Sequence, residues 1–341
     1  MEVIRVARSR GVYNRIYTPE LWEQVNQENK DILEDFLAEY KQQKKAKSTI
    51  DAYFQDARIV FIYILKHHNN KSILEMSKKD FRNFSLWLTE DCQMSPNRAN
   101  RMKATVNSML DYCENDDEYN YEINTAKKVK GIPRTKVKTN ENNFFFTFDE
   151  FIAVRNKLVE MGDLQTAVLW SISFDSAGRR NEIYQIEKEG LLDGNKTNIV
   201  VGKRGKRFPL IYLDDTKELI RRYLERRGED DIKSLWYKEV NGIRSEIDKD
   251  TLYNRIVKCS KILSEIRGET VEIFPHSIRH SRLEVLISGQ DTRIVDKNGN
   301  PKKFDIEACK LVAHHSEINT TSGYLKNHDE DIIDEMFGFT K

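Results

Sequence analysis

The sequence predicts a mainly α-helical protein of two domains with one small β-hairpin sheet. Three observations support this fold class. Apolar residues recur at helical spacing over most of the chain. One pair of short β-rich runs, at 198–202 and 208–213, departs from that pattern. The length of 341 residues also exceeds that of a usual single domain, which holds roughly 100 to 200 residues.

The first predicted domain, residues 29–125, is helical and follows an N-terminal extension at 1–28 with only a weak pattern. In the first helix, Ile32, Phe36 and Leu37 fall on one apolar stripe. Ser95 followed by Pro96 has the cap-then-proline order expected where a helix begins. Helices are expected over about 31–40, 48–65, 78–88 and 95–113.

Residues 126–144 are predicted to form a basic linker. The stretch A-K-K-V-K-G-I-P-R-T-K-V-K contains no acid, and its glycine and proline argue for an extended chain. Such local positive charge suits a segment that crosses a phosphate backbone, because binding then releases condensed counterions. We predict contact with DNA, with an ordinary solvated linker as the alternative. The basic residues are Lys127, Lys128, Lys130, Arg134, Lys136 and Lys138.

The second predicted domain, residues 145–341, begins with an S/T-x-x-E capping box at Thr147. A strongly apolar helix over 163–176 should be largely buried and ends at Gly178. After the β-hairpin, helices are expected over 216–227, 249–266, 276–288 and 304–314, and a terminal helix after Tyr324.

The composition limits the possible functions. Acidic and basic residues nearly cancel to a net charge of +1, so any DNA surface must come from local clustering. The four cysteines form no C-x-x-C pair and indicate neither a zinc ribbon nor a disulfide framework. Neither a signal peptide nor a membrane span is evident. These features predict a cytoplasmic, soluble protein.

Four segments of the second domain carry side chains suited to phosphate chemistry. In chain order they are S-A-G-R-R-N-E-I, V-G-K-R-G-K-R, F-P-H-S-I-R-H and A-H-H-S-E-I-N-T-T-S-G-Y. His276 and Arg279 are three residues apart and therefore share one helical face. A tyrosine near such groups suggests a nucleophile. Taken singly, each residue has an ordinary explanation: Tyr324 is one of fourteen tyrosines, and the basic residues could be solvated.

In their order and spacing, these segments resemble the tyrosine recombinase, or phage integrase, family. That family has an R-x-x-E pair after a helix, a lysine on the following β-hairpin, then H-x-x-R and H-x(8)-Y. The R-x-x-E register selects Arg179 rather than Arg180, because Arg179 stands three residues before Glu182. Lys203 matches the hairpin lysine better than Lys206 does.

The last motif is matched by His315, which stands nine residues before Tyr324. His314 occupies a place where the family commonly has glycine. Two departures stand out. The family's G-L-R is A-G-R here, and the stretch between Arg279 and His315 is longer than usual. The extra material is assigned to residues 291–303, whose N-G and N-P dipeptides indicate an inserted hairpin or loop.

The resemblance implies a site-specific DNA recombinase. Tyr324 would attack the scissile phosphorus and form a 3′-phosphotyrosyl link, without ATP or a metal. Lys203 would protonate the leaving 5′-oxygen, His276 would accept a proton or hydrogen bond near the nucleophile, and Glu182 would orient its neighbours. The implied catalytic residues are Arg179, Lys203, His276, Arg279, His315 and Tyr324.

The resemblance also implies partners. These are double-stranded DNA recombination sites, further copies of the chain in a homo-oligomer expected to be a tetramer at synapsis, and accessory DNA-bending or directionality proteins. Lys47, Arg98 and Arg101 match, loosely, the DNA-facing helices of the family's N-terminal domain. Docking of the terminal helix on its own domain or on a neighbouring subunit stays open.

Two other functions stay open beside recombination. A type IB topoisomerase-like relaxase would share the chemistry without exchanging strands between specific sites. A non-catalytic DNA-binding module would retain the fold with a degenerate site.

Overall fold

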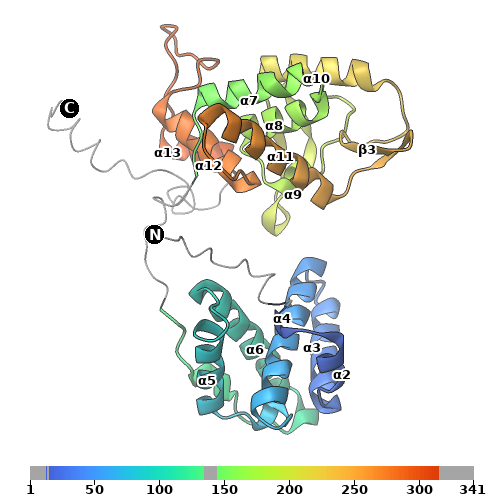
Figure 1. The fold of residues 1–341 in the computed structure, drawn as a ribbon, viewed down its shortest axis with the longest axis vertical. Coiled ribbons are helices and arrows are strands. Elements are labelled where there is room, and N and C mark those ends of the chain that lie inside the picture. Colours follow the sequence, from blue (N-terminus) through green and yellow to red (C-terminus); the bar gives the residue numbers. More distant parts are fainter. Residues whose placement is uncertain (1–12, 14, 134–143, 315–341) are drawn as a thin grey trace, which may run out of the picture. The chain divides into compact units, whose positions relative to one another are not determined.

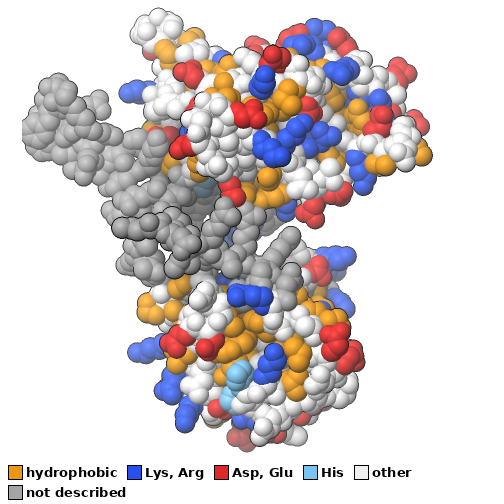
Figure 2. All heavy atoms as spheres, in the orientation of Figure 1, with side chains coloured by type: hydrophobic (Ala, Val, Ile, Leu, Met, Phe, Trp, Pro, Cys, Tyr) orange, Lys and Arg blue, Asp and Glu red, His pale blue; other side chains and the backbone are white. Residues whose placement is uncertain are grey.

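The computed structural model describes residues 13, 15–133 and 144–314, which fall into two compact units with separate cores. We call the first the helical unit and the second the C-terminal unit (Figure 1). The mainly helical fold class with small antiparallel sheets is confirmed. Acidic and basic side chains both occur on the visible face of each unit (Figure 2), in keeping with the net charge of +1.

The helical unit is built on α3, α4 and α6, which pack on one another. Its core includes Ile32, Phe36, Phe61 and Leu110, each fully buried. The four predicted helices are present, and a fifth, α2, lies within the stretch for which the sequence showed no clear pattern. The helices are α2 (Pro19–Glu23), α3 (Gln27–Gln42), α4 (Lys47–His67), α5 (Lys78–Thr89) and α6 (Pro96–Asn115).

The chain from 126 to 133 packs against the helical unit. Ala126 and Val129 are buried in its core. The Asn100 amide holds both backbone groups of Ile132, with its Nδ2 donating to the carbonyl at 2.8 Å and its Oδ1 accepting from the N–H at 2.9 Å. These residues therefore belong to the helical unit and not to an extended linker. The rest of the predicted linker, 134–143, lies outside the described residues.

The C-terminal unit is organised around α8, in which every residue from Leu164 to Ser176 is buried. Helices α7, α9, α10, α11 and α12 pack against it. Trp170 stands fully buried in the middle of α8 and donates from Nε1 to the Phe151 carbonyl at 3.1 Å. The helices are α7 (Phe148–Glu160), α8 (Leu164–Ser176), α9 (Arg180–Ile183), α10 (Asp214–Arg227), α11 (Lys249–Arg267), α12 (Pro275–Ser288) and α13 (Ile306–Val312).

Two antiparallel hairpins complete this unit. The predicted one pairs β1 (Lys196–Val201) with β2 (Arg207–Ile211). The other, which was not predicted, pairs β3 (Tyr237–Val240) with β4 (Ile243–Glu246). Its turn is Asn241–Gly242, and both residues have positive φ, at 52° and 77°. Asn-Gly is a strong sequence signal for such a turn, so this hairpin was predictable.

The segment 291–303 divides into two parts. Asp291 is buried, and the Arg293 side chain is 14% exposed. Val295 and Pro301 then form an isolated antiparallel bridge, closed by the Asp296 N–H donating to Asn300 at 2.8 Å. The expected loop is thus an exposed turn that begins only after Arg293.

Within the described ranges, every helix is too short or too polar to cross a lipid bilayer. Cys92, Cys113, Cys259 and Cys309 are all buried and unpaired.

Candidate active site

The first predicted site residue lies where α8 ends. Ala177 ends the helix in a left-handed conformation, with φ of 49°. Gly178 follows in a tight space, since a Cβ there would stand 2.8 Å from Ile183 Cδ1 and 2.9 Å from Ser176 Oγ. The chain then turns into α9, with Arg179 as the residue before its first turn.

Arg179 is held by Glu182. Its backbone N–H donates to Glu182 Oε2 at 2.8 Å, and its Nη1 donates to Oε1 at 3.0 Å. The Glu182 side chain is 1% exposed, and the Arg179 side chain is 26% exposed. A buried carboxylate that accepts two such bonds restricts where the guanidinium can point. The contact between Glu182 and Arg179 is present, and the orienting role of Glu182 stays a prediction.

Arg279 lies on α12 and is 1% exposed. Its Nη1 donates to the Ala177 carbonyl and its Nη2 to the Ala313 carbonyl. Arg279 therefore connects the end of α8 with the chain that follows α13.

His276 stands at the start of α12, on the surface of the same region. The protein atoms around its ring, and then the positive charges of Arg279 and Arg179, lower its pKa below the usual 6.5. The imidazole is therefore neutral at pH 7, the form that can accept a proton.

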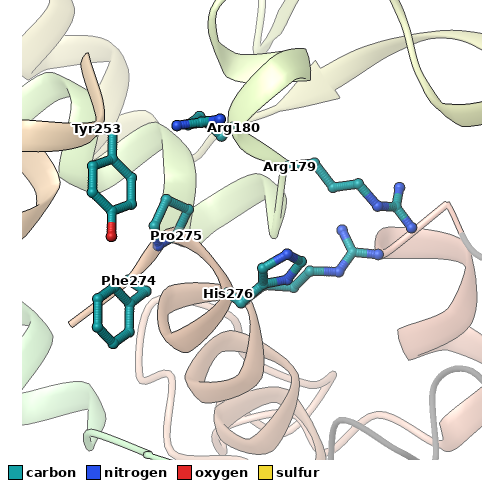
Figure 3. Close-up of a pocket in the computed structure, with 8 residues that line it drawn as sticks. Arg179, Arg180, Tyr253, Phe274, Pro275 and His276 are labelled. Carbon is teal, nitrogen blue, oxygen red and sulfur yellow. The ribbon is translucent and has the colours of Figure 1, made fainter. Parts of the chain in front are cut away.

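These three residues line one cavity of about 340 Å³ (Figure 3). Arg179 and Arg180 extend in opposite directions, so only Arg179 lies on the side where the His276 ring points. The lining residues are Gly178, Arg179, Arg180, Tyr253, Phe274, Pro275, His276 and Arg279. A pocket lined by three arginines and a neutral imidazole is suited to holding a phosphate group.

Lys203 lies on the turn between β1 and β2 and is exposed. The turn is closed by the Gly202 N–H donating to the Lys206 carbonyl at 2.8 Å. A Cβ added at Gly202 would stand 3.1 Å from Glu182 Oε1, so the turn begins beside the residue that holds Arg179. The structure thus brings the hairpin to the edge of the Arg179 region.

The described chain ends at His314, beside the pocket. His314 stacks on Phe208 of β2, with ring centroids 3.7 Å apart and an interplanar angle of 17°. Its φ of 52° is a left-handed conformation that glycine adopts most easily, which fits the family's preference for glycine at this place. His315, Tyr324 and the predicted terminal helix lie outside the described residues.

Sequence reasoning missed the far side of the pocket. Tyr253 and Phe274 are stacked with centroids 6.5 Å apart, and the Arg180 guanidinium lies 5.4 Å from the Tyr253 ring centre. Arg180 is adjacent to the predicted arginine and could have been found by position. Tyr253 carries no local signal, because a single tyrosine in an amphipathic helix is usually a packing residue.

Several predicted DNA-contact residues have partners within the helical unit. Both terminal nitrogens of Arg98 donate to the buried carboxylate of Asp56, and Arg101 Nε lies 3.3 Å from Asp56 Oδ2. Lys127 pairs with Asp111 at 2.7 Å and with Glu114 at 2.6 Å. The expectation of uncompensated charge is therefore wrong for Lys127, whose neighbours in space are acidic.

Some of the remaining predicted contact residues are exposed, and others lie outside the described residues. Lys47, Lys128 and Lys130 are exposed, and Arg101 keeps 53% of its side chain exposed. Outside the described residues are Arg134, Lys136 and Lys138.

Comparisons with known proteins agree on one group. No model of a known protein family matches the chain. The SPbeta prophage-derived recombinase-like protein YomM of Bacillus subtilis (strain 168) is 27% identical over 94% of this chain and 93% of its own length. Tyrosine recombinase XerC of Treponema denticola is 24% identical over 82% of this chain and 88% of its own length.

Solved structures share the fold. A lambda integrase tetramer bound to a Holliday junction matches with a TM-score of 0.65, at 11% identity over 95% of this chain and 88% of that chain. The XerH site-specific recombinase bound to a palindromic difH substrate matches with a TM-score of 0.62, at 16% identity over 85% of this chain and 79% of that chain. Motifs, curated relatives and fold agree, and the chain belongs to the tyrosine recombinase (phage integrase) family.

Proposed function

We propose that the chain is a site-specific DNA recombinase that cleaves and rejoins strands through a 3′-phosphotyrosyl intermediate. The observation that carries this proposal is the single cavity lined by Arg179, His276 and Arg279. Residues separated by about a hundred positions in the sequence meet there, from the ends of two different helices. A phosphodiester bound in this cavity would contact residues that line it from both parts of the chain, including Arg179 and Arg279.

The proposed chemistry uses the chain's own residues. The Tyr324 hydroxyl attacks phosphorus, the bond from phosphorus to the 5′-oxygen breaks, and a phosphotyrosyl ester remains on the 3′ side. Lys203 donates a proton to the leaving 5′-oxygen, and the neutral His276 accepts a hydrogen bond or proton near the nucleophile. A 5′-hydroxyl from another strand then reverses these steps, so the bond energy is kept and ATP is not needed.

Arg179, Arg279 and His315 are proposed to stabilise the charge that gathers on the equatorial oxygens of the transition state. Planar guanidinium forks match that geometry better than ammonium groups do. Removal of one preorganised donor of this kind lowers the rate by roughly 10² to 10³. In this proposal the two arginines supply the positive charge, and no metal takes part.

The proposed partners are double-stranded recombination sites and further copies of the chain. Support comes from the relatives, since lambda integrase has been solved as a dimer bound to a core site and as a tetramer bound to a Holliday junction. Accessory DNA-bending or directionality proteins are proposed as further partners. We also propose a cytoplasmic location, which suits the four buried, unpaired cysteines.

The test is trapping of the covalent intermediate. Sites are enriched from random duplex DNA by binding to the Tyr324→Phe variant, then rebuilt with a nick that lets the cleaved end diffuse away. The wild-type protein should form a complex that survives a denaturing gel, and Tyr324→Phe should not.

Tyr253→Phe is the matched control, because Tyr253 also lines the cavity. This variant should still form the complex. If Tyr253→Phe failed to form the covalent complex while Tyr324→Phe still formed it, the assignment of Tyr324 as the nucleophile would be wrong. Relaxation of any supercoiled plasmid without joint molecules would favour the relaxase alternative.

A further inference from the structure

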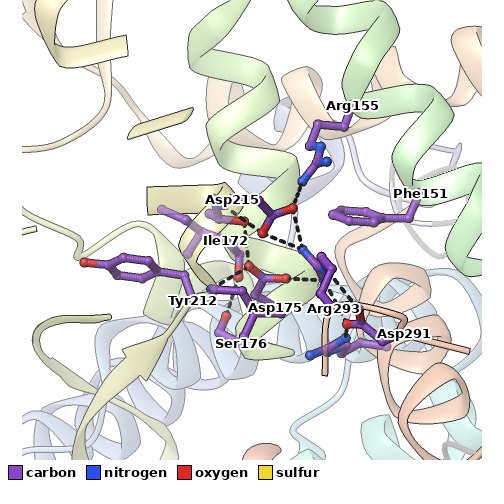
Figure 4. Close-up of polar contacts among 12 residues, drawn as sticks. Phe151, Arg155, Ile172, Asp175, Ser176, Tyr212, Asp215, Asp291 and Arg293 are labelled. Carbon is purple, nitrogen blue, oxygen red and sulfur yellow. Dashed lines mark hydrogen bonds and ion pairs between the residues drawn. The ribbon is translucent and has the colours of Figure 1, made fainter. Parts of the chain in front are cut away.

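An ionic network with buried members centres on Arg293 (Figure 4). Its Nη2 donates to Asp175 Oδ1 at 2.8 Å, and its Nη1 lies 3.1 and 3.2 Å from the two oxygens of Asp215. Its Nε donates to Asp291 Oδ1 at 2.9 Å. One guanidinium thus holds three carboxylates, from α8, from α10 and from the segment after α12.

Asp175 connects Arg293 to the end of α8. It is 1% exposed, and its second oxygen accepts from the Leu213 N–H at 3.0 Å and from Thr216 Oγ1 at 2.6 Å. Asp175 stands two residues before Ala177, whose carbonyl accepts from Arg279. It also stands four residues before Arg179.

Asp291 connects Arg293 to α12. It accepts from Arg282 Nη1, and both side chains are 2% exposed. Arg282 is three residues after Arg279 and lies on the same face of α12. The short segment from Asp291 to Arg293 therefore contacts α8, which ends three residues before Arg179, and α12, which carries Arg279.

Arg293, Asp175 and Asp291 are largely shielded from water, whereas the Asp215 side chain is 34% exposed. The Arg293 guanidinium lies 5.1 Å from the Phe148 ring centre and 5.2 Å from that of Phe151. Arg155 supplies a further donor to Asp215, so three arginines face three carboxylates. A buried network of this kind specifies one arrangement of its elements, because the loss of a partner leaves a charge buried and unpaired. Lysine, a point charge, cannot replace a guanidinium fork that reaches three carboxylates.

We propose that Asp291 and Arg293 are positioning residues, which hold α8 and α12 in the relative placement that aims Arg179 and Arg279 at one phosphate. This inference rests on the proposed function. It assigns a role to the buried part of a segment predicted only as a loop.

The test compares Arg293→Lys with Arg227→Lys. Arg227 is the matched control, since its side chain is 0% exposed and it binds Asp230 through Nε and Nη2, both at 2.7 Å. Both variants should melt at lower temperature than wild type. At a temperature where both are folded, Arg293→Lys should slow single-turnover cleavage at saturating DNA by about tenfold to a hundredfold, as small misplacements do. The Kd of Arg293→Lys for DNA should stay within about twofold of the wild-type value. The cleavage rate of Arg227→Lys should also stay within about twofold of wild type.

A second substrate separates positioning from general loosening of the fold. A methylphosphonate at the scissile position is neutral and requires less cationic stabilisation, so the deficit of Arg293→Lys should shrink on it. An equal deficit on both substrates, or no deficit on the phosphate, would overturn the inference. Asp291→Asn, a milder change, should show the same pattern and replaces Arg293→Lys if that variant does not fold. Absence of covalent product with the wild-type protein would instead count against the proposed function.

Discussion

Glu182 is buried beside the cavity but does not line it, and both of its oxygens are occupied by Arg179. It therefore affects the site through the direction of the arginine side chain. The same carboxylate also supports the first turn of α9, because it accepts the Arg179 backbone N–H.

Glu182→Gln should destabilise the protein by about 1–3 kcal/mol, since an amide cannot accept from both donors as a carboxylate does. Urea unfolding measures this change. Glu160→Gln is the control, because Glu160 forms an ion pair with Lys157 but its side chain is 70% exposed. The control should change stability by less than about 0.5 kcal/mol. Equal effects of the two variants would contradict the importance given to the buried pair.

The lowered pKa of His276 predicts the acid side of the pH profile. The neutral form is the proposed acceptor, so activity should persist as pH falls below 6.5 and decline only near the lowered pKa. Cleavage at subsaturating DNA reports the free protein and is the measurement to use. His276→Asn should remove this limb, whereas an acid limb above pH 6.5 would contradict the neutral imidazole.

At the scale of elements, the β1–β2 hairpin is positioned by close packing where its turn begins. A Cβ at Gly202 would stand 2.8 Å from Phe208 Cε1, and Phe208 in turn stacks on His314. A shift of the Phe208 ring would therefore affect the turn that carries Lys203. It would also affect the chain at His314, just before the H-x(8)-Y motif.

Gly202→Ala should destabilise the protein by about 1–3 kcal/mol through this overpacking. Gly194→Ala is the matched control before the same hairpin, because a Cβ there meets no atom within 4 Å. The control should leave stability unchanged or raise it by about 0.4–1 kcal/mol. Thermal melting of both variants makes the comparison. An unchanged melting temperature of Gly202→Ala would show that the Phe208 ring can move aside without loss of stability.

Elements with strong periodicity were predictable, and those defined by tertiary contacts were not. The apolar run of α8 and the β-rich runs around the Lys203 turn lead directly to the observed elements. The packing of 126–133 on the helical unit depends on Asn100, which lies far away in the sequence. Likewise, the carboxylates that pair with Arg98 and Lys127 are adjacent only in the folded chain.

The site divides in the same way. Order and spacing predicted Arg179, His276 and Arg279, which line one cavity. The side formed by Tyr253 and Phe274 required the packing of α11 against the start of α12, which no local pattern encodes.

At the scale of the whole molecule, the two units have cores that share no residue. The helical unit buries Phe36, Phe61 and Met109, and the C-terminal unit buries Phe151, Trp170 and Trp236. Separate cores are typical of domains that fold alone.

A fragment containing residues 13–133 should therefore fold by itself and melt in one cooperative transition. Far-UV circular dichroism during heating measures this directly. A fragment ending at 125 is the control and should melt at a lower temperature, because it lacks the buried Ala126 and Val129. Equal melting temperatures would contradict the assignment of 126–133 to this unit.

Both carbonyl partners of Arg279 recorded above belong to the main chain, at Ala177 and Ala313. A main-chain oxygen is present whatever amino acid occupies the position, so no mutation at 177 or 313 can delete either acceptor. A substitution at either of these two positions can alter the anchorage only by moving the backbone. A side-chain replacement at 177 or 313 that leaves the backbone in place therefore keeps both acceptors of the guanidinium.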